Sequence, residues 1–187
     1  LGGGQPAGGT PFLGRRLLFA NADIGLWLGR PPEGEPTLVA NVDGDEPGVA
    51  MNLIRFVRGI GLRPVVAGNL KGLYDPYRTP DTQREFAKRY GQNPRAAASF
   101  ADGTKLSMEL AVLANATGFQ VARPGMYGPK LSHVDDTAKF YRDKLLRHGM
   151  VDFTVGAAPA NGAFVLGHTD APVQQAYLKY MKMGDGP

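Results

Sequence analysis

Residues 102–109 combine an aspartate, a glycine, a lysine and a glutamate at the start of an expected helix. Lys105 and Glu109 are four residues apart and therefore share one flank of that helix. A lysine in the first turn adds to the positive end of the helix dipole, which is unfavourable unless an anionic or oxyanionic ligand binds there. The alternative is an ordinary surface, on which Asp102 caps the helix and Lys105 forms a solvent-exposed ion pair with Glu109.

Two further segments that carry charged residues also lie in loops between the expected strands and helices. In a parallel α/β arrangement, ligands bind where the carboxyl ends of strands open into loops, and the segments 43–47, 69–75 and 102–105 qualify by their order. Together they supply Asp43, Asp45, Glu46, Lys71, Asp75, Asp102 and Lys105. Lysines among carboxylates suit chemistry at a carbonyl or alcohol carbon, because an ammonium group can stabilise an oxyanion or transfer a proton to it. The pattern leaves open which lysine does so.

The acidic residues Asp43, Asp45 and Glu46 could instead bind a hard metal ion such as Mg²⁺, which prefers carboxylate and water ligands. Acidic residues before a helix also compensate its dipole, and we assign no metal ligands on this pattern. The three histidines are spaced too widely for a helical zinc pair. No G-x-S-x-G or P-loop motif is present, which argues against the hydrolases and phosphate-transfer enzymes that carry those motifs.

Composition favours a globular domain that acts on a small molecule. The 187 residues carry a net charge of +4, but lysine and arginine are scattered and form no basic stripe, so nucleic-acid binding has little support. No segment approaches the run of about twenty apolar residues that a membrane span needs. The absence of cysteine excludes disulfides and thiolate chemistry and is compatible with a reducing compartment. We therefore expect a cytoplasmic location.

Hydrophobic periodicity and turn residues predict the helices and strands that position these charged residues. Helices are predicted at 49–59, 82–90, 102–118, 135–148 and 171–181. Strands are predicted at 37–42, 63–68, 120–122, 151–156 and 163–167, with the last two paired around a turn at 159–162. We interpret the residues around Ser99 as a strand end that leads into the 102–105 turn, and residues 69–81 as a long loop.

A strand, an acidic turn, a helix and a second strand follow one another between residues 37 and 68. Such a crossover unit favours parallel pairing of its two strands. The alternation of strands and helices predicts an α/β fold with a mixed sheet and flanking helices. Residues 1–14 are rich in glycine and predict a flexible lead-in.

Several ordered blocks of the chain resemble a bacterial family of homoserine-dehydrogenase-like, NAD(P)-dependent oxidoreductases that usually carry a C-terminal SAF domain. The blocks are residues 42–82, SFADGTKLSMELAVLANATG, ARPGMYGP, VDFTVGA and residues 172–187. Deoxyxylulose phosphate reductoisomerase-like enzymes form a related branch with a similar DGTK turn. The resemblance implies that residues 1–36 are a lead-in and a remnant of a Rossmann-type cofactor-binding domain, with Asn21 and Asp23 near the cofactor. Residues 37–187 then form the central catalytic and dimerisation domain, which ends before a SAF-like domain.

The resemblance also implies that the charged residues line the substrate pocket, and it implies a role for each of them. Expected catalytic residues are Lys71, Lys105 and Asp102, and expected substrate-binding residues are Asp45, Glu46, Asp75 and Glu109. The implied activity is that of a dehydrogenase or reductoisomerase acting on a small hydroxy acid, polyol or sugar-phosphate-like substrate, in a homo-oligomer. Most of the NAD(P) site is expected in a domain absent from this chain, because the dinucleotide glycine motif is missing, so we expect the isolated chain to be inactive. The alternative function is a non-catalytic dimerisation or anion-binding module.

Overall fold

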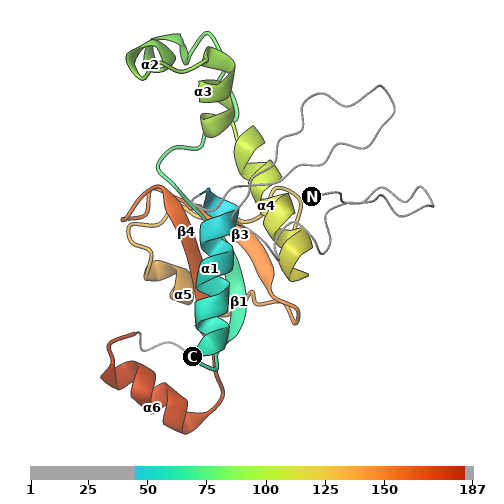
Figure 1. Cartoon of the computed structure of the whole chain (residues 1–187), viewed down its shortest axis with the longest axis vertical. Helices are drawn as coiled ribbons and strands as arrows, with labels where there is room; N and C mark the ends of the chain where they lie inside the picture. Colours follow the sequence, from blue (N-terminus) through green and yellow to red (C-terminus); the bar gives the residue numbers. More distant parts are fainter. Residues whose placement is uncertain (1–44, 184–187) are drawn as a thin grey trace, which may run out of the picture.

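The computed structural model describes residues 45–183, which form an α/β fold built on a mixed sheet of four strands (Figure 1). The predictions for the lead-in, for the strand at 37–42 and for Asn21, Asp23 and Asp43 concern residues outside this range. The strands are β1 (Arg63–Lys71), β2 (Gln120–Val121), β3 (Met150–Val155) and β4 (Gly162–His168). Their order across the sheet is β2-β3-β1-β4. The predicted fold class is confirmed.

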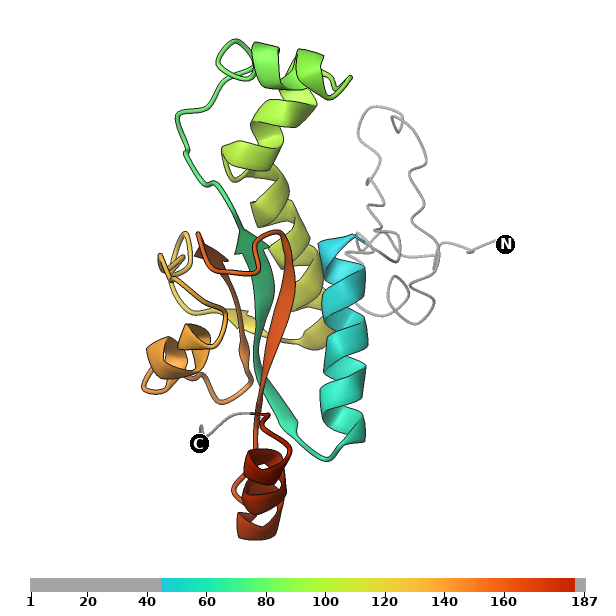
Figure 2. The ribbon, with the colours of Figure 1, turned by 90° about the vertical axis from the view of Figure 1, so that its left-hand side faces the viewer.

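The central strand β1 is buried along nearly its whole length because helices or loops cover both of its faces. It runs parallel to β3, with Asn69 opposite Phe153, and antiparallel to β4. Helices α1 (Glu46–Gly59) and α4 (Thr104–Thr117) pack on one face of the sheet, where Ile54, Leu106 and Leu110 join the core. Figure 2 shows α1 and the short helix α5 (Asp136–Tyr141) on opposite sides of the sheet.

The predicted pairing of the last two strands is wrong. Strands β3 and β4 have nearly the expected bounds, but β1 lies between them and pairs with both. A short connection between two apolar strands predicts a hairpin, but it does not exclude a third strand between them. The strongly apolar β1 competes successfully for both partners, because only a central position buries both of its edges and both of its faces.

The interpretation of the residues around Ser99 as a strand end is also wrong. They belong to helix α3 (Pro94–Ala101), in which Pro94 occupies the first turn and Asn93 accepts a hydrogen bond from the backbone N–H of Arg95 at 2.8 Å. A proline in the first turn after a capping asparagine is a helix start, and the small residues that follow it form a helix. Helices α2 (Arg84–Arg89), α3 and the start of α4 project away from the sheet (Figure 1).

Two other predicted elements differ from the structure in their bounds. The predicted loop at 69–81 begins too early, because β1 continues to Lys71. The predicted helix at 135–148 is confined to α5, whereas the helix at 171–181 is observed as α6 (Pro172–Tyr180). None of the helices within residues 45–183 has the length and apolar character needed to cross a bilayer.

Candidate active site

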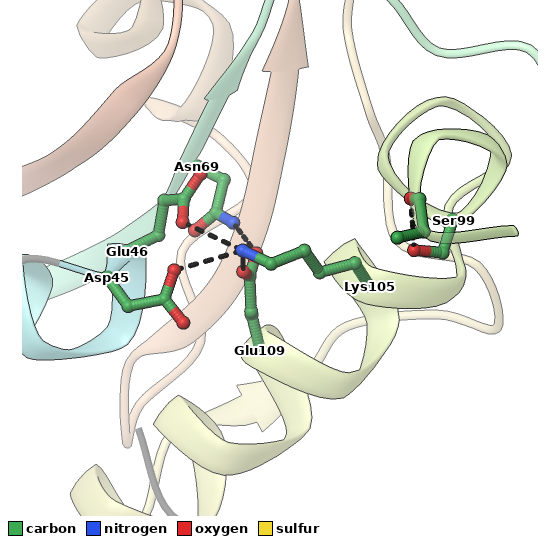
Figure 3. A network of polar contacts seen from close by, with 7 residues as sticks. Asp45, Glu46, Asn69, Ser99, Lys105 and Glu109 are labelled. Atoms are coloured by element: carbon green, nitrogen blue, oxygen red, sulfur yellow. Dashed lines mark hydrogen bonds and ion pairs between the residues drawn. The ribbon is translucent and has the colours of Figure 1, made fainter. Parts of the chain in front are cut away.

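Lys105 lies at the centre of a carboxylate cluster formed by Asp45, Glu46 and Glu109 (Figure 3). Its Nζ is 2.9 Å from Asp45 Oδ1 and 3.3 Å from Glu46 Oε2, and it also forms an ion pair with Glu109 Oε1. The Lys105 side chain is 24% exposed, whereas that of Glu109 is fully buried. The cluster is therefore closed at Glu109, while the side chains of Lys105, Asp45 and Glu46 each remain partly exposed.

Asn69 holds the buried end of this cluster. Its Nδ2 donates a hydrogen bond of 2.8 Å to Glu109 Oε2, so both carboxylate oxygens of Glu109 are engaged. Asn69 is only 1% exposed, and its Oδ1 has no hydrogen-bond partner among the described residues. An unpaired buried amide oxygen costs free energy, and it is an acceptor available to a ligand that carries a donor or a cation.

Two helix starts and one strand end bring these residues together. Asp45 stands at the N-cap position of α1, without a capping hydrogen bond from its side chain, and Glu46 lies in the first turn, where the positive end of the dipole stabilises negative charge. Helices α1 and α4 pack on the same core, so the first turn of α4 places Lys105 beside the start of α1. Asn69 reaches the same point from β1 because side chains on a strand alternate between faces, and its neighbour on that face, Ala67, lies in the core under both helices.

The entry into α4 depends on Gly103. Its φ of +92° is unfavourable for any residue with a side chain, and a Cβ atom there would lie 2.7 Å from the Tyr74 ring. Tyr74 in turn packs edge-on against Phe153, with ring centroids 5.2 Å apart. Behind the turn, the Phe100 ring lies 5.7 Å from Lys105 Nζ. The turn that precedes Lys105 is thus fixed by packing.

The environment keeps Lys105 charged. Partial burial by itself lowers the pKa of Lys105, but its hydrogen bonds to Glu109 and Asp45 and the surrounding negative charge outweigh that effect and raise the pKa above its ordinary value. Burial raises the pKa of Glu109, and the nearby carboxylates add to this effect against the opposing influence of Lys105. Glu109 is therefore the member of the cluster in which burial most favours a protonated carboxyl group.

Glu46 behaves differently from Glu109. Partial burial raises the pKa of Glu46, but hydrogen bonding with Asp45 and with its own backbone, together with the Lys105 ammonium, holds the pKa below its ordinary value. Two glutamates that contact the same lysine are thus pushed in opposite directions. Such a divergence separates a permanent negative charge, on Glu46, from a group that can exchange a proton, Glu109.

Of the seven predicted catalytic and substrate-binding residues, the structure brings four together, Lys105, Asp45, Glu46 and Glu109. Asp102 is not the predicted N-cap, because Gly103 takes that position, but Asp102 Oδ1 still accepts a hydrogen bond from the N–H of Thr104 at 2.7 Å. Asp75 is paired with Arg78 at 3.0 Å and is not part of the cluster. Lys71 ends β1 on the same face as Asn69, and its ammonium group has no ion-pair partner within residues 45–183.

Sequence reasoning missed two buried polar residues. Asn69 was assigned to a loop, although it continues the apolar strand and is itself buried. Asp152 is fully buried in β3, and its carboxylate accepts N–H hydrogen bonds from Tyr127, Gly128 and Phe153. The available signal was the same in both cases, a single polar residue inside an apolar strand, which requires a partner when buried.

The donor set of the cluster also fits a hard cation. The carboxylate oxygens of Asp45, Glu46 and Glu109 lie within 4.8 Å of one another. Asn69 Oδ1 adds a neutral oxygen without a donor. These are the ligand types that Mg²⁺ and Mn²⁺ prefer. In this structure the Lys105 ammonium lies among the same oxygens, so a metal ion would have to compete with it.

A family model described as the catalytic domain of oxidoreductase DRL matches residues 44–187. No curated protein matches the chain significantly. The matched region includes every residue of the cluster.

Proposed function

The chain belongs to the catalytic-domain family of oxidoreductase DRL, and on that basis we propose that Lys105 is the proton donor and acceptor at the reacting oxygen of the substrate. The observation that carries this proposal is the position of its ammonium group, which three carboxylates fix while a quarter of the side chain remains open to solvent. A general acid must be held within hydrogen-bond reach of its substrate, and its position matters before its pKa does.

We propose NAD(P) as the redox cofactor and a small hydroxy acid, polyol or sugar-phosphate-like molecule as the substrate. The nicotinamide would supply or remove the hydride at the substrate carbon. In the reducing direction, Lys105 donates a proton to the oxygen as the C=O double bond becomes a C–O single bond and negative charge develops on the oxygen. The neutral amine that remains takes up a replacement proton from solvent, and the Glu109 carboxylate beside it stabilises the ammonium that forms again.

The raised pKa keeps Lys105 in its charged form, which favours electrostatic stabilisation of the substrate oxygen over the role of a base. A lysine that stays protonated stabilises an oxyanion before it transfers its proton. Asp45 and Glu46 hold the ammonium in place, and Glu109 with Asn69 closes the site behind it. Lys71 remains a proposed catalytic residue and Asp75 a proposed substrate-binding residue. Asp102 is proposed to act by fixing the turn that precedes Lys105. The homo-oligomer and the cytoplasmic location also remain proposals.

The test is steady-state kinetics of the full-length protein, followed by NAD(P)H absorbance over hydroxy acids, polyols and sugar phosphates. For Lys105→Ala we expect a loss of about 10²- to 10⁴-fold in kcat, the usual contribution of a general acid. Lys139 is a matched control, because it is exposed and has one distant carboxylate partner, and Lys139→Ala should keep full activity. A folded Lys105→Ala variant with kcat within threefold of the wild type would refute the role of Lys105.

A second candidate function rests on the three carboxylates of Asp45, Glu46 and Glu109, which offer oxygen ligands within 4.8 Å of one another. With a divalent cation in the cluster, Lys105 would be displaced towards solvent and the cation would polarise the substrate oxygen. The kinetic assay separates the two candidates when it is repeated with excess chelator. Activity that survives chelation supports the lysine, and activity that returns only on addition of Mg²⁺ or Mn²⁺ supports the cation.

A further inference from the structure

A hollow in the surface lies at the opposite end of β1 from the lysine cluster. It has a volume of about 330 Å³, and its rim carries Arg58, Arg63, Arg147 and His148. Arg63 begins β1 and Asn69 lies six residues further on, so the two regions are separated by about 20 Å along the strand. The rest of the lining is mainly apolar and comprises Leu62, Pro64, Thr117 and Phe119.

The charges around this hollow come from three parts of the chain. Arg58 lies in the last turn of α1, Arg63 opens β1, and Arg147 with His148 precedes β3. The fold therefore gathers cations that are up to ninety residues apart in the sequence. This concentration is invisible in the sequence, where no run of basic residues marks it.

No carboxylate lines the hollow, and none of its arginines forms an ion pair with a residue in the described range 45–183. Two helix C-termini, those of α1 and α4, lie near the rim and attract cations. Each helix end contributes about half a negative charge, so together they offset only about one of the three guanidinium charges. The remaining excess of about two positive charges has no partner among the lining residues.

We propose that this hollow is a binding site for a small organic polyanion that carries phosphate or carboxylate groups. Guanidinium groups bind both groups through paired, charge-assisted hydrogen bonds, and three of them at one rim match a ligand with at least two negative charges. The apolar floor of Leu62, Pro64 and Phe119 accommodates the ligand's carbon skeleton. The volume lies at the lower end of the range for ligand pockets, about 300 to 1,000 Å³, which fits a small molecule.

The test is calorimetric titration of the full-length protein with pyrophosphate and with citrate, and with glucose as an uncharged control. We expect saturable binding of at least one anion that weakens as salt is raised, and no binding of glucose. A stronger response to pyrophosphate identifies a phosphate site, and a stronger response to citrate identifies a carboxylate site. No saturable binding of either anion up to about 10 mM, an affinity weaker than about −3 kcal/mol, would overturn the proposal.

Arg63→Gln and Arg147→Gln should each weaken anion binding by about tenfold, the effect of one lost charge-assisted hydrogen-bond pair. Arg89→Gln is the matched control, because Arg89 is an exposed arginine at the end of α2 and does not line the hollow. Thermal unfolding verifies that each variant is folded. Equal weakening in all three variants, or binding of an oligonucleotide without any of the small anions, would overturn the proposal. Lys105→Ala should leave anion binding unchanged, so that a failure of the proposed active site and a failure of this site are distinguished.

Discussion

Replacing Lys105 with alanine removes the only positive charge that contacts Asp45, Glu46 and Glu109 among the described residues. Glu109 is then left buried without its counterion. Removing one partner of a buried ion pair costs about 3–5 kcal/mol, and because Lys105 is a quarter exposed and Glu109 can take up a proton, we expect a smaller loss of about 2 kcal/mol at pH 8.

The same substitution should make stability more dependent on pH. In the folded state the pKa of Glu109 already lies above its ordinary value, and loss of Lys105 raises it further. Between the unfolded and folded pKa values the folded chain binds more protons than the unfolded chain, so stability falls as the pH rises through that window. The loss should therefore be smaller at pH 5 than at pH 8, because the raised pKa of Glu109 favours its neutral form increasingly as the pH falls.

Urea unfolding at pH 5 and pH 8 measures both effects. The double variant Lys105→Ala, Glu109→Gln should recover most of the loss at pH 8, because glutamine keeps an acceptor for Asn69 Nδ2 and carries no charge. Lys139→Ala is the control, since Lys139 is 81% exposed and its loss should cost below about 0.5 kcal/mol. An equal loss at both pH values, or no recovery in the double variant, would show that Glu109 is not the buried charge that Lys105 neutralises.

Three further predictions concern other parts of the structure. Gly103→Ala should lower stability by about 2–3 kcal/mol in urea unfolding, whereas Gly118→Ala should cost only about 1 kcal/mol, because both have positive φ but only Gly103 also faces the Tyr74 ring. Asp152→Ala should lower the free energy of unfolding by more than about 3 kcal/mol, because it leaves three backbone N–H groups unpaired. Asp152→Asn should lower it by about 1 kcal/mol, because the amide oxygen can still accept those hydrogen bonds. Equal losses in the two variants would contradict this assignment. If the carboxylate cluster binds a divalent cation, millimolar Mg²⁺ or Mn²⁺ should raise the melting temperature of the wild type but not that of Glu109→Gln, and an unchanged melting temperature in the wild type counts against the metal.

The fold class and most elements could be predicted because they depend on local patterns. The apolar spacing of α1 and of α4 identifies both helices and their buried faces. The errors occurred where a non-local choice decides the structure. The order of the strands depends on which strands pair with β1. The sequence of β3 and β4 and of the turn between them gives no information on this, because it does not include β1. Helix α3 differs because it is only eight residues long, so its apolar pattern covers about two turns and its start depends on Asn93 and Pro94.

The lysine cluster was predicted in part, since Lys105 and Glu109 are neighbours on one helix and their contact follows from spacing alone. The contact of Lys105 with Asp45 joins residues sixty positions apart and depends on how α1 and α4 pack. Asn69 was beyond prediction for the same reason, because only the sheet reveals that this polar residue points under the helices.

The two ends of β1 have opposite electrostatic character, and this difference constrains what each can bind. At the end near Asn69, three carboxylates contact one lysine, so the excess charge is negative and a free anion would be repelled unless it contacts the Lys105 ammonium directly. At the end near Arg63, three arginines line a hollow without a carboxylate, and an anion meets no such barrier.

A substrate of the active site must therefore present a polar oxygen to Lys105 and keep any phosphate or carboxylate group away from Asp45 and Glu46. A polyanion without such an oxygen should bind at the arginine end alone. Competition between citrate or pyrophosphate and substrate in the kinetic assay tests this argument, because two separate sites about 20 Å apart predict that excess substrate does not displace either anion.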